Sequence, residues 1–308
     1  MSAQTETRRL TIADIAKIHR EGGRIVAITA YDYPTARIVD AVGIPLILVG
    51  DSVGMVMLGY DSTVRVSIEE MLHHTRAVVR GTRRSLVVAD MPFLTYGVSV
   101  EESVANAGRF LHDAGAQAVK VEGGVRTVRA IEAIVRNGIP VMAHIGLTPQ
   151  AVNALGGFKV QGRDRDSAQA LLADAFAVQE AGAFSVVLEA LPSPLATAIT
   201  QRLRIPTIGI GAGAGCAGQI QVITDLLGLT ADHTPKHARQ YAQVASVMAE
   251  ALTAYARDVE AGTFPGPAES FTMDETVLSD VLGLGALDQA ATVGAMDRAV
   301  AIPLDEDL

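Results

Sequence analysis

The sequence predicts a (β/α)₈ barrel, and three observations support this. The chain has 308 residues, which suits one barrel of about 250 residues or two modest domains. Seven apolar, β-rich segments alternate with helical patterns, as in a parallel sheet covered on both faces. At least five of them end in a residue that can do chemistry, and the C-terminal strand ends of a barrel share the rim where active sites lie. An open, doubly wound sheet is the alternative.

The predicted strands are continuous apolar runs, the pattern of strands buried on both faces. They are Ile25–Ala30, Pro45–Gly50, Ser85–Asp90, Ala118–Gly123, Pro140–His144, Ser185–Glu189 and Pro206–Gly211. An eighth strand is hard to find. The best candidate is His233–Pro235, where Pro235 limits strand pairing.

Helical patterns fill the intervals between the strands. A first helix starts at Thr11, with Asp14 in its first turn, and stops at Gly22-Gly23. Further helices are expected over Ser67–Arg80, Val100–Ala114, Arg126–Arg136 and Asp166–Glu180. A long connection runs from Gly146 to Asp166, and connections of that length are often active-site lids.

Composition argues against several classes of protein. The longest clean apolar stretch, Ile44 to Gly50, is far shorter than the roughly 20 residues of a membrane helix. No apolar segment follows Arg8 and Arg9, so we expect no signal peptide. The single cysteine, Cys216, excludes an internal disulfide and fits a cytoplasmic location.

Negative charge is concentrated at the C-terminal end. The chain carries a net charge of -9, and residues 267–308 hold nine acids against one base. The first 266 residues are therefore nearly neutral, without a basic patch for nucleic acid. We expect a catalytic barrel over residues 1–266 and an acidic, partly mobile tail over 267–308, with a short helix between Val277 and Leu287.

Three acids stand at the ends of three different predicted strands: Asp51, Asp90 and Glu122. Carboxylates gathered at one barrel mouth repel each other unless a cation lies among them. Oxygen ligands without a Cys or His cluster favour a hard ion, most plausibly Mg²⁺. The alternative is that each acid caps the helix that follows it, an objection that applies most to Asp51.

Other strand-end residues have two interpretations each. Lys120 faces the same side of its strand as Glu122, where it either holds an anionic substrate or forms an internal ion pair. His144 is either a donor to a substrate oxygen or a structural residue. Glu189 follows Val-Val-Leu, an apolar context that raises proton affinity and suits a general base. A further metal ligand or a partner for the lid is its alternative.

A glycine-rich segment follows the seventh predicted strand, from Gly209 to Gly215. It lacks the spacing of a dinucleotide-binding fingerprint, and no Gly-Lys-Ser/Thr follows it. We expect tight backbone packing there, or close approach to a flat ligand. Cys216 has no neighbouring His or Lys to activate it, which argues against a catalytic thiol.

At these residues the chain resembles the ketopantoate hydroxymethyltransferase (3-methyl-2-oxobutanoate hydroxymethyltransferase) family of pantothenate biosynthesis. Matching motifs occur in order from about Thr11 to Phe271. They are Ala30-Tyr-Asp-Tyr33, Gly50-Asp-Ser-Val-Gly-Met55, Gly59-Tyr-Asp-Ser-Thr63, Asp90-Met-Pro-Phe93 with Tyr96, Lys120-Val-Glu-Gly-Gly124, His144-Ile-Gly-Leu-Thr-Pro-Gln150, Gly156-Gly-Phe-Lys-Val-Gln-Gly162, Glu189-Ala-Leu-Pro192 and Gly209-Ile-Gly-Ala-Gly213.

The resemblance implies a Mg²⁺-dependent barrel that assembles as a homodecamer. It implies transfer of a one-carbon unit from 5,10-methylenetetrahydrofolate to 3-methyl-2-oxobutanoate, through a Mg²⁺-stabilised enolate, to give 2-dehydropantoate. The implied metal ligands are Asp51, Asp90 and Glu122, and the implied base is Glu189. The implied contacts to the keto acid are Asp51, Ser52, Asp90, Lys120 and His144.

Two departures from the family and one rival function also follow from the sequence. Ala217 stands where similar proteins usually carry Asp, and the segment beyond Phe271 has no recognised counterpart. The rival is a Mg²⁺-dependent 2-oxo acid lyase or phosphoenolpyruvate mutase-like enzyme. Such enzymes usually carry a Lys-Lys-Cys-Gly-His loop, and no cysteine precedes Cys216 here.

Overall fold

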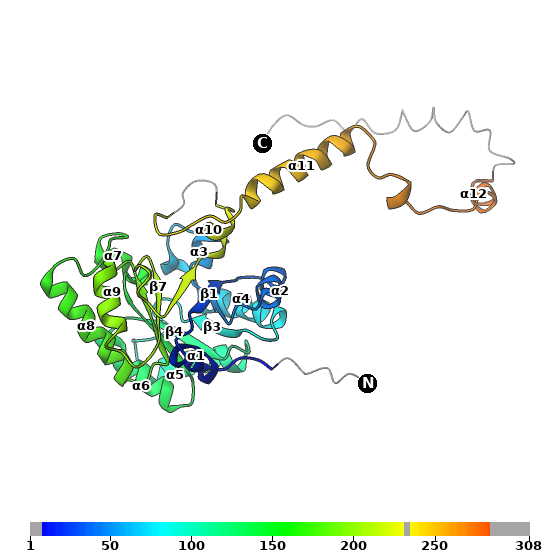
Figure 1. Ribbon diagram of the computed structural model, residues 1–308. Coiled ribbons are helices and arrows are strands. Elements are labelled where there is room, and N and C mark those ends of the chain that lie inside the picture. Colours follow the sequence, from blue (N-terminus) through cyan, green and yellow to red (C-terminus); the bar gives the residue numbers. More distant parts are fainter. Residues whose placement is uncertain (1–7, 231–234, 284–308) are drawn as a thin grey trace. The chain divides into compact units, whose positions relative to one another are not determined.

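Eight parallel strands close into a barrel in the computed structural model, which describes residues 8–230 and 235–283 (Figure 1). Each strand pairs with the next along the chain, and the last pairs with the first. The strands are β1 Ile25–Thr29, β2 Leu46–Val49, β3 Leu86–Asp90, β4 Ala118–Glu122, β5 Val141–Gly146, β6 Ser185–Glu189, β7 Thr207–Ile210 and β8 Gly218–Gln221. The predicted barrel is confirmed, and a closed barrel excludes an open sheet.

The seven strands expected from apolar runs are all present, with ends that differ by two residues at most. The eighth was placed wrongly. It is β8, not His233–Pro235, and residues 233 and 234 of that segment lie outside the described part. β8 reads Gly-Gln-Ile-Gln, with Ile220 buried and Gln219 exposed. This alternation hides the strand from a search for continuous apolar runs.

Helices alternate with the strands along the chain. The α-helices are α1 Ile12–Arg20, α2 Tyr33–Val42, α3 Val53–Val56, α4 Ile68–Gly81, α5 Val100–His112, α6 Val128–Arg136, α7 Val152–Leu155, α8 Arg165–Glu180, α9 Ser193–Thr200, α10 Ile223–Leu227, α11 Val244–Glu260 and α12 Glu275–Leu282. The 3₁₀ turns are η1 Thr63–Arg65, η2 Val125–Thr127, η3 Pro149–Ala151 and η4 Pro267–Glu269. The five helices expected before residue 181 match α1, α4, α5, α6 and α8.

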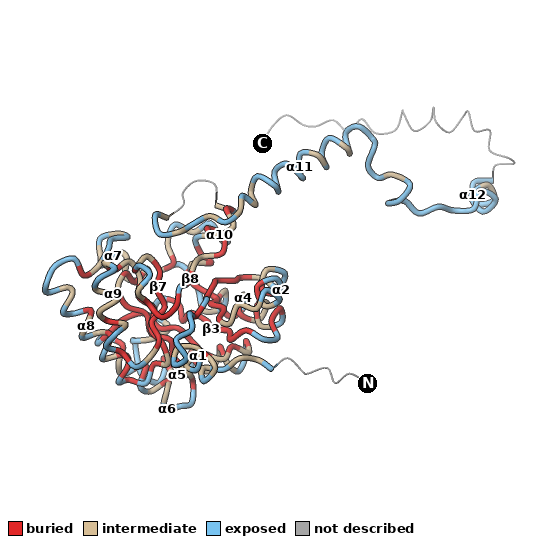
Figure 2. The backbone as a smooth tube through the Cα atoms, in the orientation of Figure 1, coloured by how far each residue is buried: buried red, intermediate tan, exposed pale blue. Residues whose placement is uncertain are grey.

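The buried residues form two apolar layers, and the strands that separate them are the most buried part of the backbone (Figure 2). One layer lies between the strands and the outer helices. The other fills the barrel interior, and Ile15 of α1 belongs to it together with Ile25 and Leu46. Because Ile25 and Leu46 begin their strands, α1 covers the N-terminal end of the barrel. The C-terminal rim is left for chemistry.

Two compact units make up the chain, with the division between Ala245 and Ser246. The first unit contains the whole barrel. In the second, α11 and α12 have no buried residue. The short helix expected between Val277 and Leu287 corresponds to α12, and residues 284–287 lie outside the described part. No helix among the described residues is both long and apolar enough to cross a membrane.

Candidate active site

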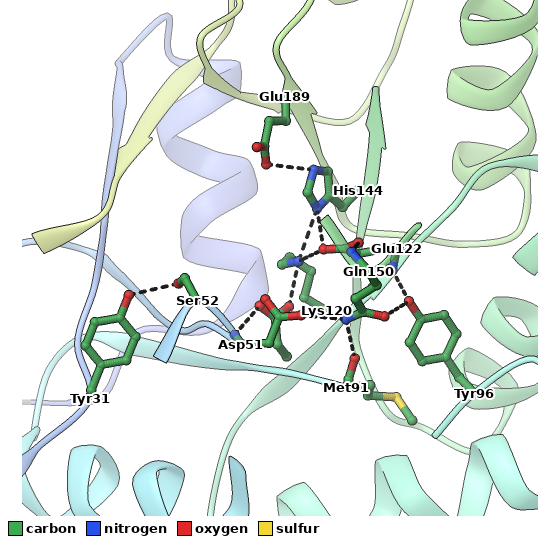
Figure 3. A network of polar contacts seen from close by, with 11 residues as sticks. Tyr31, Asp51, Ser52, Met91, Tyr96, Lys120, Glu122, His144, Gln150 and Glu189 are labelled. Atoms are coloured by element: carbon green, nitrogen blue, oxygen red, sulfur yellow. Dashed lines mark hydrogen bonds and ion pairs between the residues drawn. The ribbon is translucent and has the colours of Figure 1, made fainter. Parts of the chain in front are cut away.

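The predicted chemical residues gather at the C-terminal rim of the barrel because neighbouring strands align them. The register pairs Asp90 of β3 with Lys120 of β4, and Glu122 of β4 with His144 of β5. Asp51 follows β2 directly, and Glu189 ends β6. These side chains come from five consecutive strands and point toward one another (Figure 3).

Lys120 is the centre of a buried ionic network. Its Nζ lies 2.7 Å from Asp90 Oδ1, 3.3 Å from Glu122 Oε1 and 3.1 Å from His144 Nδ1. His144 Nδ1 lies 3.2 Å from Glu122 Oε1, and its Nε2 lies 3.2 Å from Glu189 Oε2. The ionic network therefore runs from Asp90 through Lys120, Glu122 and His144 to Glu189 (Figure 3). Lys120 therefore forms the internal ion pair that we considered. This ion pair does not exclude a second role in holding an anionic substrate.

Asp51 and Asp90 form the second part of the site. The backbone amide of Asp51 donates to Asp90 Oδ2 at 3.0 Å, and Asp51 Oδ2 accepts from Gln150 Nε2 at 2.8 Å. The residue that precedes α3 is Ser52, which makes no capping bond. Its hydroxyl instead pairs with Tyr31 Oη at 2.9 Å. Asp51 therefore does not serve as the helix cap that we considered.

Burial controls the protonation of these groups. Burial raises the pKa of Asp51 well above its usual value, and the nearby carboxylates of Asp90 and Glu122 raise it further. For Glu122, burial acts upward, but Lys120 and His144 outweigh it and lower its pKa to about 2. Burial and Lys120 act to lower the pKa of His144, but Glu122 and Glu189 prevail and raise it to about 9. Lys120 and His144 thus outweigh burial at Glu122, whereas at Asp51 burial and the two carboxylates outweigh Lys120.

The donor chemistry of Asp51, Asp90 and Glu122 fits a hard divalent ion. All three are buried carboxylates, and Asp51 has an amide partner where its charge calls for a cation. In their present arrangement, no three His, Cys, Asp or Glu side chains in residues 8–230 and 235–283 form a group that could hold a metal ion. A bound ion would therefore need these side chains in a different arrangement. The three-carboxylate ligand set stays a prediction.

Gln150 and Tyr96 are two polar residues of the site that the sequence predicts only as members of the family motifs. Gln150 is buried, and its amide contacts Asp51 while its backbone amide contacts Glu122. The hydroxyl of Tyr96 donates to Gln150 Oε1 at 2.5 Å. No strand ends at either residue, so the strand-end criterion could not find them. Their places in the matched motifs were the available signal.

The long connection expected to be a lid starts at the site. It contains η3 and α7, and its far part is held to the rim because Gln161 N donates to Ala190 O at 2.9 Å. Ala190 also lines an open groove of about 1050 Å³. The described groove lining holds the cations Arg24, Lys236 and Arg239 without any acid, and it excludes the buried ionic network.

The glycine-rich segment packs tightly against α9. A Cβ on Gly213 would lie 2.2 Å from Ser193 Oγ, and one on Gly215 would lie 2.0 Å from Thr197 Oγ1. Of the two interpretations, backbone packing is therefore the one the contacts support. Cys216 is buried, and burial raises the pKa of its thiol, so the predicted absence of a reactive thiolate agrees with the structure.

Comparison with known proteins identifies the family. A sequence profile described as ketopantoate hydroxymethyltransferase matches residues 9–267. The chain belongs to this family. A 3-methyl-2-oxobutanoate hydroxymethyltransferase of Chloroflexus aurantiacus is 60% identical over 282 residues, covering 92% of this chain and 99% of that protein. The enzyme of the same name from Dehalococcoides mccartyi is 54% identical over 273 residues, covering 89% of this chain and 97% of that protein.

Solved structures with the same fold are more distant. A phosphonopyruvate hydrolase has a TM-score of 0.56 at 13% identity, covering 94% of this chain and 99% of that one. A 2,3-dimethylmalate lyase of the phosphoenolpyruvate mutase/isocitrate lyase superfamily has a TM-score of 0.55 at 19% identity, with the same coverage. At this identity the likeness concerns the barrel alone. The rival lyase or mutase function is therefore supported by the fold only. Membership of the hydroxymethyltransferase family is supported by most of the sequence.

Proposed function

We propose that this hydroxymethyltransferase transfers a one-carbon unit from 5,10-methylenetetrahydrofolate to 3-methyl-2-oxobutanoate, as in pantothenate biosynthesis. The observation that carries the proposal is the buried set of Asp51, Asp90, Lys120, Glu122 and His144 next to Glu189 on one barrel rim. In overall balance, the keto acid, the methylene folate and one water give 2-dehydropantoate and tetrahydrofolate. A C–C bond forms at C3 and a C–O bond forms with the oxygen of water, while both C–N bonds between the methylene carbon and the folate break.

Asp51, Asp90 and Glu122 are the proposed holders of Mg²⁺. When bound there, the ion would supply Lewis-acid polarisation of the 2-oxo group, an effect worth several kcal/mol. Support comes from their oxygen-only chemistry and from the burial of all three carboxyl groups at one rim of the barrel. The proposed contacts to the keto acid are Asp51, Ser52, Asp90, Lys120 and His144.

Glu189 is the proposed base that removes the C3 proton. Its side chain is 16% exposed, against 3% for His144 beside it, so it has the more open position of the two. His144 Nε2 lies 3.2 Å from Glu189 Oε2 and can hold that carboxylate in place. Loss of the C3 proton gives an enolate carbon that attacks the methylene group. The connection from Gly146 to Asp166 is the proposed lid that excludes water during this step.

The decisive experiment separates proton removal from carbon transfer. Deuterium exchange at C3 of 3-methyl-2-oxobutanoate is followed with and without the folate, and 2-dehydropantoate formation is measured in parallel. We expect Mg²⁺-dependent exchange without folate and product only with folate. Unchanged turnover after exhaustive chelation would remove the metal role, and exchange without any product would favour the lyase-like alternative.

A homo-oligomer, a decamer by family resemblance, is the proposed assembly, and the cytoplasm is the proposed location. Support for assembly comes from α11, where Met248, Leu252, Tyr255 and Val259 are all at least 46% exposed. Their spacing of four, three and four residues makes one apolar stripe, the kind of surface that partners cover.

The open groove beside Ala190 is the proposed place for the folate, because its cations suit the carboxylates of the folate's glutamate tail. Residues 1–266 remain the proposed catalytic domain.

A further inference from the structure

We propose that Gln150 competes with a divalent cation for two carboxylates, that of Asp51 through its side-chain amide and that of Glu122 through its backbone N–H. It thereby sets the ion affinity of the site as a positioning residue. The inference rests on the proposed metal site and adds a residue that tunes it. It is carried by hydrogen bonds that Gln150 makes to two of the three proposed ligands, which come from two different strands.

The side-chain amide of Gln150 uses both of its protons inside the site. Nε2 donates to Asp51 Oδ2 at 2.8 Å and to the carbonyl of Met91 at 3.0 Å (Figure 3). Gln150 is only 5% exposed, and Asp51 only 4%. The amide therefore stands beside a buried carboxylate where a cation would also be held.

Tyr96 fixes which way this amide points. The backbone N–H of Glu122 donates to Tyr96 Oη at 3.2 Å. The Tyr96 hydroxyl in turn donates to Gln150 Oε1 at 2.5 Å. The oxygen of Gln150 is thereby committed to Tyr96, so its NH₂ group must face Asp51. Tyr96 thus keeps the competing donor in place.

The backbone of Gln150 makes the second contact, because its N–H donates to Glu122 Oε2 at 3.1 Å. Glu122 Oε1 is near Lys120 and His144, so both oxygens of this carboxylate have donors from the chain. An ion that binds Asp51 Oδ2 or Glu122 Oε2 competes with the Gln150 donor at that oxygen. Since Gln150 lies in η3 at the start of the proposed lid, ion binding and lid position are coupled, and such coupling is reciprocal.

Loss of the Gln150 amide should change the Mg²⁺ affinity of the site in a predictable direction. A buried carboxylate that loses its hydrogen-bond donor raises the free energy of the folded protein. A bound cation would compensate for the lost donor. Gln150→Ala should therefore bind Mg²⁺ about tenfold more tightly than the wild type, on the order of one hydrogen bond to a charged group. If Gln150 instead arranged the ligands for the ion, its removal would weaken binding.

Calorimetric titration of the purified full-length chain with MgCl₂ tests this, and thermal melts with and without Mg²⁺ give a second readout. We expect Gln150→Ala to show the lower Tm without Mg²⁺ and the larger rise in Tm with it. Tyr96→Phe should shift affinity in the same direction by a smaller factor. The control is Gln243→Ala, an exposed glutamine outside this connection, whose side chain donates to Gln240 Oε1 and whose loss should leave affinity unchanged.

Equal or weaker Mg²⁺ binding by Gln150→Ala, in a background where the wild type binds, overturns the inference and leaves the metal site standing. No Mg²⁺ binding by the wild type overturns both, and the two failures are thus distinguishable. If Gln150→Ala does not fold, Tyr96→Phe decides alone. Tighter binding by it supports the inference, and unchanged or weaker binding overturns it.

Discussion

Glu189 differs from its neighbours in the network by keeping contact with solvent, which suits a group that must meet the keto acid. We predict that Glu189→Gln lowers kcat by about 10²–10⁴-fold, the usual size of a lost general base, with little change in the KM of the keto acid. The amide keeps the volume but cannot accept a proton. Steady-state kinetics and C3 deuterium exchange should fall together.

Glu180→Gln is the control for this change, since Glu180 lies on the surface of α8 with its side chain 64% exposed. It should behave as wild type. Exchange at the wild-type rate in Glu189→Gln would assign the base to another residue. Loss of exchange together with a much higher keto-acid KM would make Glu189 a binding group instead.

At the residue scale, sequence reasoning found the strand-end acids, Lys120 and His144 because parallel strands carry their last residues to one rim. It could not find the roles of Gln150 and Tyr96, since neither ends a strand. Their contacts depend on how the connection after β5, which carries Gln150, and the connection after β3, which carries Tyr96, fold over the rim. These paths are properties of tertiary packing, which a local pattern does not encode.

At the element scale, Asp40 of α2 holds the turn that leads into β3. Its carboxylate accepts from the backbone amides of Arg83, Arg84 and Ser85 at 2.9, 3.0 and 2.7 Å. We predict that Asp40→Asn destabilises the fold by about 2 kcal/mol, because hydrogen bonds to a charged acceptor are replaced by neutral ones. Denaturant unfolding would measure the loss, and the exposed Asp61→Asn serves as control.

The stability difference between the wild type and Asp40→Asn should depend on pH. Burial acts to raise the pKa of Asp40, but the hydrogen bonds from Ser85, Arg83 and Arg84 outweigh it and lower the pKa below 3.8. A carboxylate with a lowered folded-state pKa stabilises fully above its unfolded value and loses that stabilisation as pH falls through the folded value. The stability gap between wild type and Asp40→Asn should therefore shrink below about pH 4. A gap independent of pH would contradict it.

The groove beside Ala190 gives a prediction for the folate. Arg239→Ala should raise the KM for a polyglutamyl methylenetetrahydrofolate about two- to fivefold, the size of one exposed ion pair, and leave the keto-acid KM unchanged. Added salt should shrink the difference, because exposed charges are screened. Arg202→Ala, just after α9, is the control, because Arg202 does not line the groove. Equal KM values for the folate in both variants would place its tail elsewhere.

Most elements of the barrel were predictable because buried parallel strands are apolar along their whole length. β8 was not, since Gln219 faces solvent and only Ile220 joins the barrel interior. Helix α2 was also missed, although Asp32 caps it and Pro34 stands in its first turn. The β8 strand has only four residues, and pairing with β1 and β7 decides its structure more than local pattern does. For α2, the capping signal was present in the sequence.

At the scale of the whole molecule, the acidic end after residue 266 is expected to be dispensable for the fold. The described helices η4 and α12 have no buried residue, and the family match ends at residue 267. A chain ending at Gly266 should keep its Tm within about 2 °C of wild type, because the removed described segment buries no core. It should also keep C3 exchange. A large fall in Tm would place residues 267–308 within the catalytic domain.

The apolar stripe of α11 leads to a prediction about assembly. Leu252 is 63% exposed in the single chain, and burial between chains would remove it from water. A carboxylate at this position would have to be buried without a partner, so Leu252→Glu should dissociate the oligomer. Light scattering should give about 322 kDa for a wild-type decamer, ten times the 32.2 kDa chain, and a smaller mass for the variant. Glu250→Gln on the same helix should keep the wild-type mass, and an unchanged mass for Leu252→Glu would exclude this stripe from the interface.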